Sequence, residues 1–275
     1  MIRVLLKNVG ANFWRITWST CLNTCLFLWF SFYTNAQEVL IGEKIHSKVY
    51  SWMSGSKSSE GARSIVSGST THLQLLDIKA ITLYAGSGDV TLPAHEEMEL
   101  LIIVKEGQLS VTLENESTTI GPGSVAMILP GDSYALNNTT SENTIYYALQ
   151  YRSKAPVNVD RGRNAGGSFI IDWDQVAFNS HNKGGRRDFF HRATAMCEDF
   201  EMHVTNLNEG TSSHDPHTHE VEEIILMIKG DISMHIDGSE SPATRGDLAF
   251  LDSNISHAPT NIGSGQCMYF AFQWK

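Results

Sequence analysis

Residues 210–230 read GTSSHDPHTHEVEEIILMIKG and hold the densest group of metal-binding residue types in the chain. Two histidines, His217 and His219, precede Glu223, and His257 follows further along. Alternate residues of a β-strand face the same side, so the first three side chains can converge inside a small barrel. The alternative is a solvated acidic loop with chance histidines, because Glu220 also lies in this stretch. A set of four potential ligand residues, three histidines and one glutamate, flanked by spaced glycines favours a metal site.

The sequence around this motif repeats an earlier part of the chain. The matching pairs, at an offset of 124 and then of 123 residues, are His95 with His219, Glu99 with Glu223, Gly107 with Gly230, and Gly123 with Gly246. The equal glycine spacing in the two halves is hard to obtain by chance. We therefore predict two tandem copies of one domain, beginning near Trp52 and Trp173.

Each copy consists of short apolar runs separated by turn residues, with little at helical spacing. This pattern is typical of an all-β sandwich or barrel. The glycines, proline and arginines of residues 153–168 indicate a linker. We assign residues 37–152 to the first copy and residues 169–275 to the second.

The motifs of the second copy resemble those of the cupin family. Residues 210–230 are similar to the first cupin motif, although the spacing before His217 is one residue longer than usual. Residues 246–261, GDLAFLDSNISHAPTN, are similar to the second motif, with Asp252 and Asn254 where the family often has proline and glycine.

The resemblance implies two jelly-roll barrels, each a double-stranded β-helix. The implied metal ligands are His217, His219, Glu223 and His257. The layout is similar to (S)-ureidoglycine aminohydrolase and to exported bicupins of Bacteroidota. That aminohydrolase family, however, has Glu, His and Gln where this chain has His217, Glu223 and His257.

The first copy has lost part of this ligand set, because the matched positions hold Pro93, His95, Glu99 and Tyr134. We predict one divalent metal ion per chain, held by the second copy; Zn, Mn, Fe, Ni and Co all suit such ligands. The first copy then completes the structure. A sharper hypothesis gives Tyr134, with His95, a role in sugar binding or in acid–base chemistry.

Three further histidines are candidates for a general base: His203, His214 and His235. Strand alternation places His203 on a polar face with Glu201 and Thr205, either at the barrel mouth or toward solvent, and we favour it as the base. His214 lies in the loop that enters the site. Arg63 and Arg187 occupy matching positions in the two copies. An arginine can bind a substrate carboxylate through two hydrogen bonds, and the alternative is a structural role.

Residues 1–36 resemble an export signal, with Arg3, Lys7 and Arg15 before an apolar run and small residues up to Ala36. The apolar run is too short to span a bilayer, so we expect a periplasmic or secreted protein without membrane insertion after cleavage. Cys197 and Cys267 remain in the mature chain, and their pairing is left open.

The net charge and the expected compartment limit the classes of partner and substrate. The chain has 20 Lys and Arg against 30 Asp and Glu, a net charge of −10, which disfavours nucleic acid as a partner. Exported enzymes often meet polysaccharide fragments, so we expect a metal-dependent lyase or dehydratase that eliminates water from an acidic sugar or uronate-containing oligosaccharide during carbohydrate degradation.

The alternatives are a metal-dependent hydrolase acting on a ureide, a dioxygenase using ferrous iron, and a non-catalytic sugar-binding cupin. The sequence does not predict the oligomeric state, and a homodimer is one of the states compatible with it.

Overall fold

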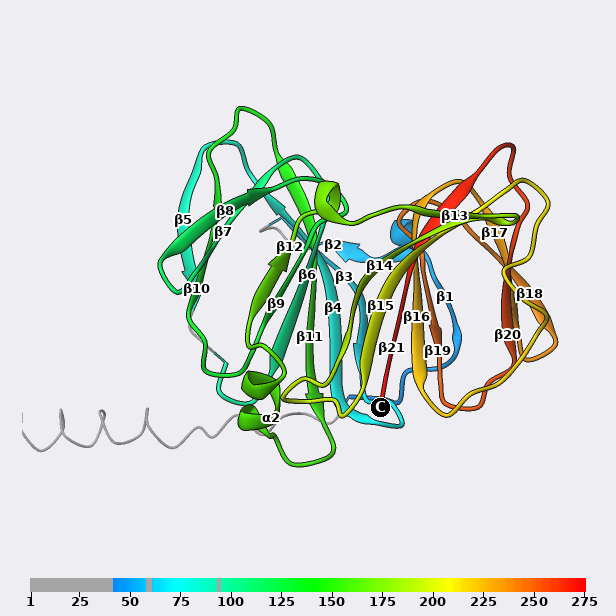
Figure 1. The fold of residues 1–275 in the computed structure, drawn as a ribbon, viewed down its shortest axis with the longest axis horizontal. Coiled ribbons are helices and arrows are strands. Elements are labelled where there is room, and N and C mark those ends of the chain that lie inside the picture. The colour runs from blue at the N-terminus through cyan, green and yellow to red at the C-terminus, as the bar shows by residue number, and fades with distance from the viewer. Residues whose placement is uncertain (1–41, 58–60, 93–94) are drawn as a thin grey trace, which may run out of the picture. The chain divides into compact units, whose positions relative to one another are not determined.

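Nearly all regular structure in the computed structural model is β-strand, arranged as two barrels (Figure 1). The structure describes residues 42–57, 61–92 and 95–275, so the predicted export signal lies outside it. Among these residues, no helix has the length and apolar character needed to span a membrane. The prediction of an all-β fold with two jelly-roll barrels is confirmed.

Each barrel pairs a seven-stranded sheet with a smaller one, and all pairs of named strands are antiparallel. The larger sheet of the first barrel contains β2 (Ser56–Lys57), β3 (Ala62–Gly68), β4 (Leu73–Leu83), β6 (Glu99–Glu106), β9 (Val125–Ile128), β11 (Thr144–Ser153) and β12 (Phe169–Ile171). Its smaller sheet contains β5 (Ser87–Leu92), β7 (Leu109–Leu113), β8 (Glu116–Ile120) and β10 (Tyr134–Asn138).

The second barrel has the same plan. Its larger sheet contains β1 (Lys48–Tyr50), β13 (Asn179–His181), β14 (Gly184–Arg192), β15 (Phe200–Leu207), β16 (Glu222–Lys229), β19 (Leu248–Leu251) and β21 (Cys267–Trp274). Its smaller sheet contains β17 (Ile232–Ile236), β18 (Ser239–Ala243) and β20 (His257–Asn261). The short helices are η1 (Trp52–Ser54), α2 (Val159–Asn164) and η2 (Trp173–Gln175).

The two barrels exchange edge strands. β1 lies before the first barrel in sequence, yet it pairs with β19 of the second barrel, with Val49 opposite Ala249. β12 follows the first barrel and pairs with β9, with Ile170 opposite Ala126. The segment that precedes each barrel therefore completes the larger sheet of the other barrel, across the sequence boundary between the two copies.

Each exchanged segment leads into a tryptophan that packs on a glycine of the other barrel. A Cβ atom on Gly123 would lie 2.4 Å from the Trp173 ring, and one on Gly246 would lie 3.2 Å from Trp52. The backbone N–H of Trp52 donates to Asp247 (2.7 Å), and that of Trp173 donates to Ser124 (3.0 Å). The repeated glycines thus make room for these rings.

The repeated arginines support the same tryptophans. The guanidinium carbon of Arg63 lies 5.2 Å from the centre of the Trp52 ring, and that of Arg187 lies 4.8 Å from the Trp173 ring. Both arginines also donate to backbone carbonyls close by. Of the two roles weighed for these residues, the structural one accounts for their contacts.

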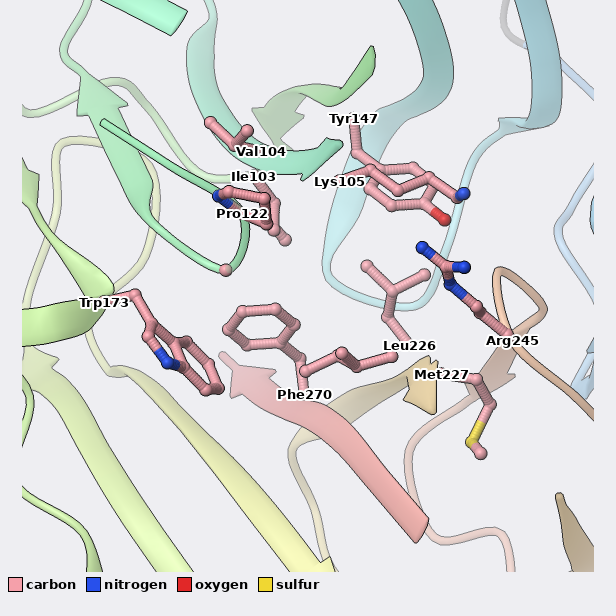
Figure 2. Close-up of a pocket in the computed structure, with 12 residues that line it drawn as sticks. Ile103, Val104, Lys105, Pro122, Tyr147, Trp173, Leu226, Met227, Arg245 and Phe270 are labelled. Atoms are coloured by element: carbon pink, nitrogen blue, oxygen red, sulfur yellow. The ribbon is translucent and has the colours of Figure 1, made fainter. Parts of the chain in front are cut away.

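The larger sheets of the two barrels pack against each other through a shared apolar core. Along β6 and β16 the side chains alternate: Leu101 and Ile224 enter this shared core, whereas Ile102 and Ile225 face the interior of their own barrel. Between the barrels lies a mainly apolar cavity of about 160 Å³, whose walls come from both halves (Figure 2). Cys197 and Cys267 are buried free thiols.

Candidate metal centre

The four predicted ligands converge in the second barrel. His217 and His257 form an antiparallel bridge, in which the N–H of each donates to the carbonyl of the other (3.3 and 3.0 Å). Glu223 projects from the start of β16, opposite Leu251 of β19. His219 lies in the loop before β16. Ligand atoms of the three histidines all lie within 4.8 Å of one another.

Hydrogen bonds fix which nitrogen of two histidines faces the centre. Nδ1 of His219 lies 2.9 Å from the carbonyl of Val221, and Nδ1 of His257 lies 2.8 Å from that of Ile255. A carbonyl can only accept, so both Nδ1 atoms carry hydrogen. In the neutral rings Nε2 is then a lone pair, and this arrangement is typical of metal-binding histidines.

Both Nε2 atoms point at one carboxylate oxygen. Oε2 of Glu223 lies 3.3 Å from Nε2 of His219 and 3.0 Å from Nε2 of His257. Nε2 of His257 is fully buried and has no aligned hydrogen-bond partner. Lone pairs that converge without a hydrogen between them repel, and a cation among them removes that repulsion. The residues therefore fit a divalent metal ion.

Glu223 is ionised at physiological pH. Burial alone raises its pKa, but when a proton rather than a metal ion lies among these groups, hydrogen bonds and charge interactions from the protonated rings of His219 and His257 outweigh burial and hold the pKa at about 2. The same carboxylate raises the pKa of His219. The centre thus offers one negative charge together with imidazole nitrogens, a donor set that suits Zn, Mn, Fe, Ni or Co.

His214 lies beside this centre, as its place in the entering loop suggests. Its Nδ1 lies 2.9 Å from Nδ1 of His217, and the two ring centres are 4.1 Å apart. Its Nδ1 also lies 3.0 Å from the carbonyl of Asp215. Burial lowers the pKa of His214. His214 can therefore orient His217 or contact a bound substrate.

The centre opens into a cavity of about 490 Å³ inside the second barrel. His203 of β15 lines this cavity together with Thr205, whereas Met202 and Val204 face the shared core, so the predicted alternation is correct and its polar face is the cavity side. Burial lowers the pKa of His203, and its Nδ1 has no aligned partner although Glu201 lies 3.3 Å away. A neutral, buried imidazole in a cavity can accept a proton.

Basic residues from the β13–β14 hairpin line the same cavity, and the sequence analysis did not single them out. They are His181, Lys183 and Arg186. Lys183 donates to the carbonyl of Ser213 (2.9 Å), and Arg186 pairs with Asp188 and Glu201. Arg186 and Arg187 are neighbours on a strand, so alternation sends one into the cavity and the other to Trp173.

Two other candidates lie away from this cavity. Tyr134 belongs to the apolar interior of the first barrel, where burial raises its pKa to about 12. His235 pairs with Glu240 (2.8 Å), on a strand whose neighbours Met234 and Ile236 are buried in the barrel interior. His95 is exposed, and position 93 lies outside the described residues.

The prediction that Glu99 occupies the position of Glu223 is wrong by one residue. Glu99 lies opposite Tyr151. Glu222 lies opposite Trp274 in the equivalent strand pair of the second barrel. Leu100 therefore stands where the second barrel has Glu223. The sequence contains two adjacent glutamates, so the alignment could not distinguish them.

Comparisons with known proteins agree with this architecture. Residues 203–272 match the cupin domain family (Cupin_2). A search of curated protein sequences gave no significant match.

Among solved structures, the putative glyoxylate-induced protein of Pseudomonas aeruginosa is 19% identical with a TM-score of 0.64, covering 81% of this chain and 85% of that one. Oxalate decarboxylase of Lactobacillus farciminis, in a formate complex, is 13% identical with a TM-score of 0.63, covering 84% and 87%. A variant of salicylate 1,2-dioxygenase from Pseudoaminobacter salicylatoxidans is 11% identical with a TM-score of 0.53, covering 72% and 71%.

The second barrel is thus a cupin domain, and the two barrels together have the fold of a bicupin. Similarity at this level of identity establishes the fold and leaves the reaction to be argued from the residues of the cavity.

Proposed function

We propose that the protein is a metal-dependent carbon–oxygen lyase that eliminates water from a small acidic sugar or a uronate-containing oligosaccharide. The observation that carries this proposal is the composition of one cavity: a metal-fitting set of three histidines and a glutamate, an uncharged buried histidine, and basic side chains that favour an anion. Each of these groups has a distinct task in elimination.

The four ligands His217, His219, Glu223 and His257 would hold the ion. A bound divalent ion polarises a substrate carboxylate and so acidifies the hydrogen on the adjacent carbon. His203 would accept that hydrogen as a proton, because burial lowers its pKa and an imidazole that is uncharged at neutral pH can act as a base. As the carbon–carbon double bond forms, the bond from the next carbon to its hydroxyl breaks. The proton that His203 accepted is returned to the departing hydroxyl, which leaves as water, and His203 is neutral again.

The basic side chains of Lys183 and Arg186 support an anionic substrate. They line the cavity, and Arg186 already pairs with Glu201, which lies beside His203. The substrate class also rests on the predicted export of the protein, because a periplasmic or secreted enzyme would meet polysaccharide fragments.

The test is direct. Purified protein loaded with each candidate divalent metal is incubated with uronate oligosaccharides, and ultraviolet absorbance at about 235 nm is followed, since elimination creates a conjugated unsaturated acid. We expect a rise in absorbance that His203→Ala reduces strongly. Oxygen consumption without that rise would instead indicate a dioxygenase, and hydrolysis without it a hydrolase. Binding without any turnover would indicate a sugar-binding protein.

A further inference from the structure

Glu222, a buried carboxylate of the second barrel, is held by a loop of the first barrel. Its side chain has no exposed surface. Thr70 donates its hydroxyl to Oε2 (2.7 Å), and the backbone N–H of Thr71 donates to Oε1 (2.6 Å). The backbone N–H of His72 also donates to Oε1 (3.3 Å), and Trp274 of the second barrel donates its indole N–H to Oε2 (2.9 Å). Burial raises the pKa of Glu222, and the hydrogen bonds from Thr70 and Thr71 oppose that rise.

This carboxylate immediately precedes a metal-ligand candidate. Glu222 and Glu223 begin β16 with their side chains on opposite faces, Glu222 toward the first barrel and Glu223 toward the metal centre. Fixing Glu222 therefore fixes the backbone from which Glu223 projects. The same loop also contacts the segment next to another ligand, because Nε2 of His72 lies 3.3 Å from the carbonyl of Glu220, the residue after His219.

We propose that the loop of residues 70–72 positions the metal ligands, so that the first barrel, through Glu222, sets the metal affinity of the second. Thr70, Thr71 and Glu222 are positioning residues in this role, because none of them is among the four predicted ligands. Such partners of ligands commonly change metal affinity by about 10- to 100-fold. The inference rests on the metal centre of the proposed function and is independent of the reaction carried out there.

The repeat supplies a matched control within the same chain. Glu99 is the counterpart of Glu222, and a loop of the second barrel holds it in turn, because the N–H of Ala195 donates to its Oε1 (2.6 Å). Thr194 is the counterpart of Thr70: its hydroxyl accepts from the N–H of Cys197 (3.0 Å), as that of Thr70 accepts from the N–H of Leu73 (2.9 Å). Thr70 and Thr194 are equally buried. The residue that follows differs in the way that the test needs, because Glu99 precedes the apolar Leu100 whereas Glu222 precedes the ligand candidate Glu223.

The experiment compares Thr70→Val with Thr194→Val in the full chain. The dissociation constant for Co²⁺ is measured by competition with a chelator, the visible spectrum of the Co²⁺-loaded protein is recorded, and thermal unfolding reports stability. We expect Thr70→Val to raise the dissociation constant about 10-fold or more and to alter the spectrum. Thr194→Val should lose comparable stability but stay within about twofold of wild-type affinity. Thr70→Ser should restore both readouts because it keeps the hydroxyl.

Equal affinities for the two valine variants, or an unchanged spectrum in Thr70→Val, would overturn the inference. Should Thr70→Val fail to fold, Glu222→Gln and its counterpart Glu99→Gln replace the pair with the same expectations. A wild-type chain that binds no Co²⁺ would refute both the metal centre and this inference. A wild-type chain that binds Co²⁺ but eliminates no water would refute only the proposed reaction.

Discussion

The interiors of the two barrels differ at a few positions within otherwise equivalent frameworks. Ile102 and Ile225 occupy equivalent places on β6 and β16, and both are buried in their barrel's own core. Yet Leu100 stands opposite Ile128 where Glu223 stands opposite Leu251. At these positions the first barrel consequently has an apolar cluster that contains Leu100, Ile128 and Tyr134, whereas the second has a polar cavity of about 490 Å³.

The difference shows how little sequence change separates a structural barrel from one with a candidate site. Tyr134 begins β10 as His257 begins β20, and with Leu100 at the position of Glu223 and Pro93 at that of His217, three of the four ligand positions differ from the second barrel. A buried carboxylate is tolerated only with partners, which the second barrel supplies and the first lacks. The predictions below change one barrel and use the other as its control.

The largest effect should come from His219→Ala, which we expect to abolish metal binding. Its counterpart is His95→Ala, because the carbonyl of His95 accepts from Gly131 (3.1 Å) as that of His219 accepts from Asn254 (2.8 Å). His95→Ala should leave the metal content unchanged. Elemental analysis of both purified variants measures their metal content. Metal loss from the His95 variant would contradict a metal site confined to the second barrel.

Making the first barrel resemble the second should destabilise it strongly. Leu100→Glu buries a carboxylate among apolar side chains, and we expect a loss of about 3 kcal/mol or more in the free energy of unfolding at neutral pH. Burial would raise the pKa of this group, so the folded state would bind its proton more tightly and the loss should grow as pH rises above about 4.3. Denaturant unfolding across pH measures this; Leu100→Gln, which does not titrate, should show no added pH dependence.

His203→Ala should separate chemistry from metal binding. The ion stays, because His203 is not among its ligands, and turnover falls about 10²-fold, the usual contribution of a positioned base. Steady-state kinetics beside metal analysis distinguishes the two effects. Full turnover in this variant would place the base elsewhere, with His214 the next residue to substitute.

The smallest effect concerns the packing of the barrels. Gly123→Ala should cost more stability than Gly246→Ala, because the added Cβ would lie 2.4 Å from Trp173 but 3.2 Å from Trp52. Both glycines have positive φ, so each change also strains the backbone. We expect losses of about 1–3 kcal/mol, measured by thermal unfolding. A larger loss of stability in Gly246→Ala than in Gly123→Ala would mean that the Trp173 ring moves to make room for the added Cβ.

Much of this organisation could be predicted from sequence because it depends on local pattern. The repeat follows from matching residues at a nearly constant offset, and the alternation around His203 follows from strand periodicity. The same periodicity predicts the convergence of the ligands, but His219 lies in the loop before β16 and His217 only in an isolated bridge. The strand with which an exchanged edge strand pairs cannot be predicted from local pattern. Three residues such as Lys48–Tyr50 form a similar edge strand in either barrel, and tertiary packing alone selects β19.

Contacts between the barrels could not be predicted from sequence either, because they depend on the direction in which each side chain points. Glu222 and Glu223 are chemically identical neighbours, and only the direction of each side chain assigns one to Thr70 and the other to His257. Arg186 and Arg187 pose the same problem on β14. Sequence composition cannot decide which of two adjacent residues faces the cavity without the register of the strand.

The central claim, that metal binds only the second barrel, is tested most directly by a crystal structure of the protein equilibrated with Co²⁺, with the ion located by its anomalous scattering. We predict one ion per chain, within bonding distance of His217, His219, Glu223 and His257. An ion in the interior of the first barrel, or none among these four residues, would contradict it.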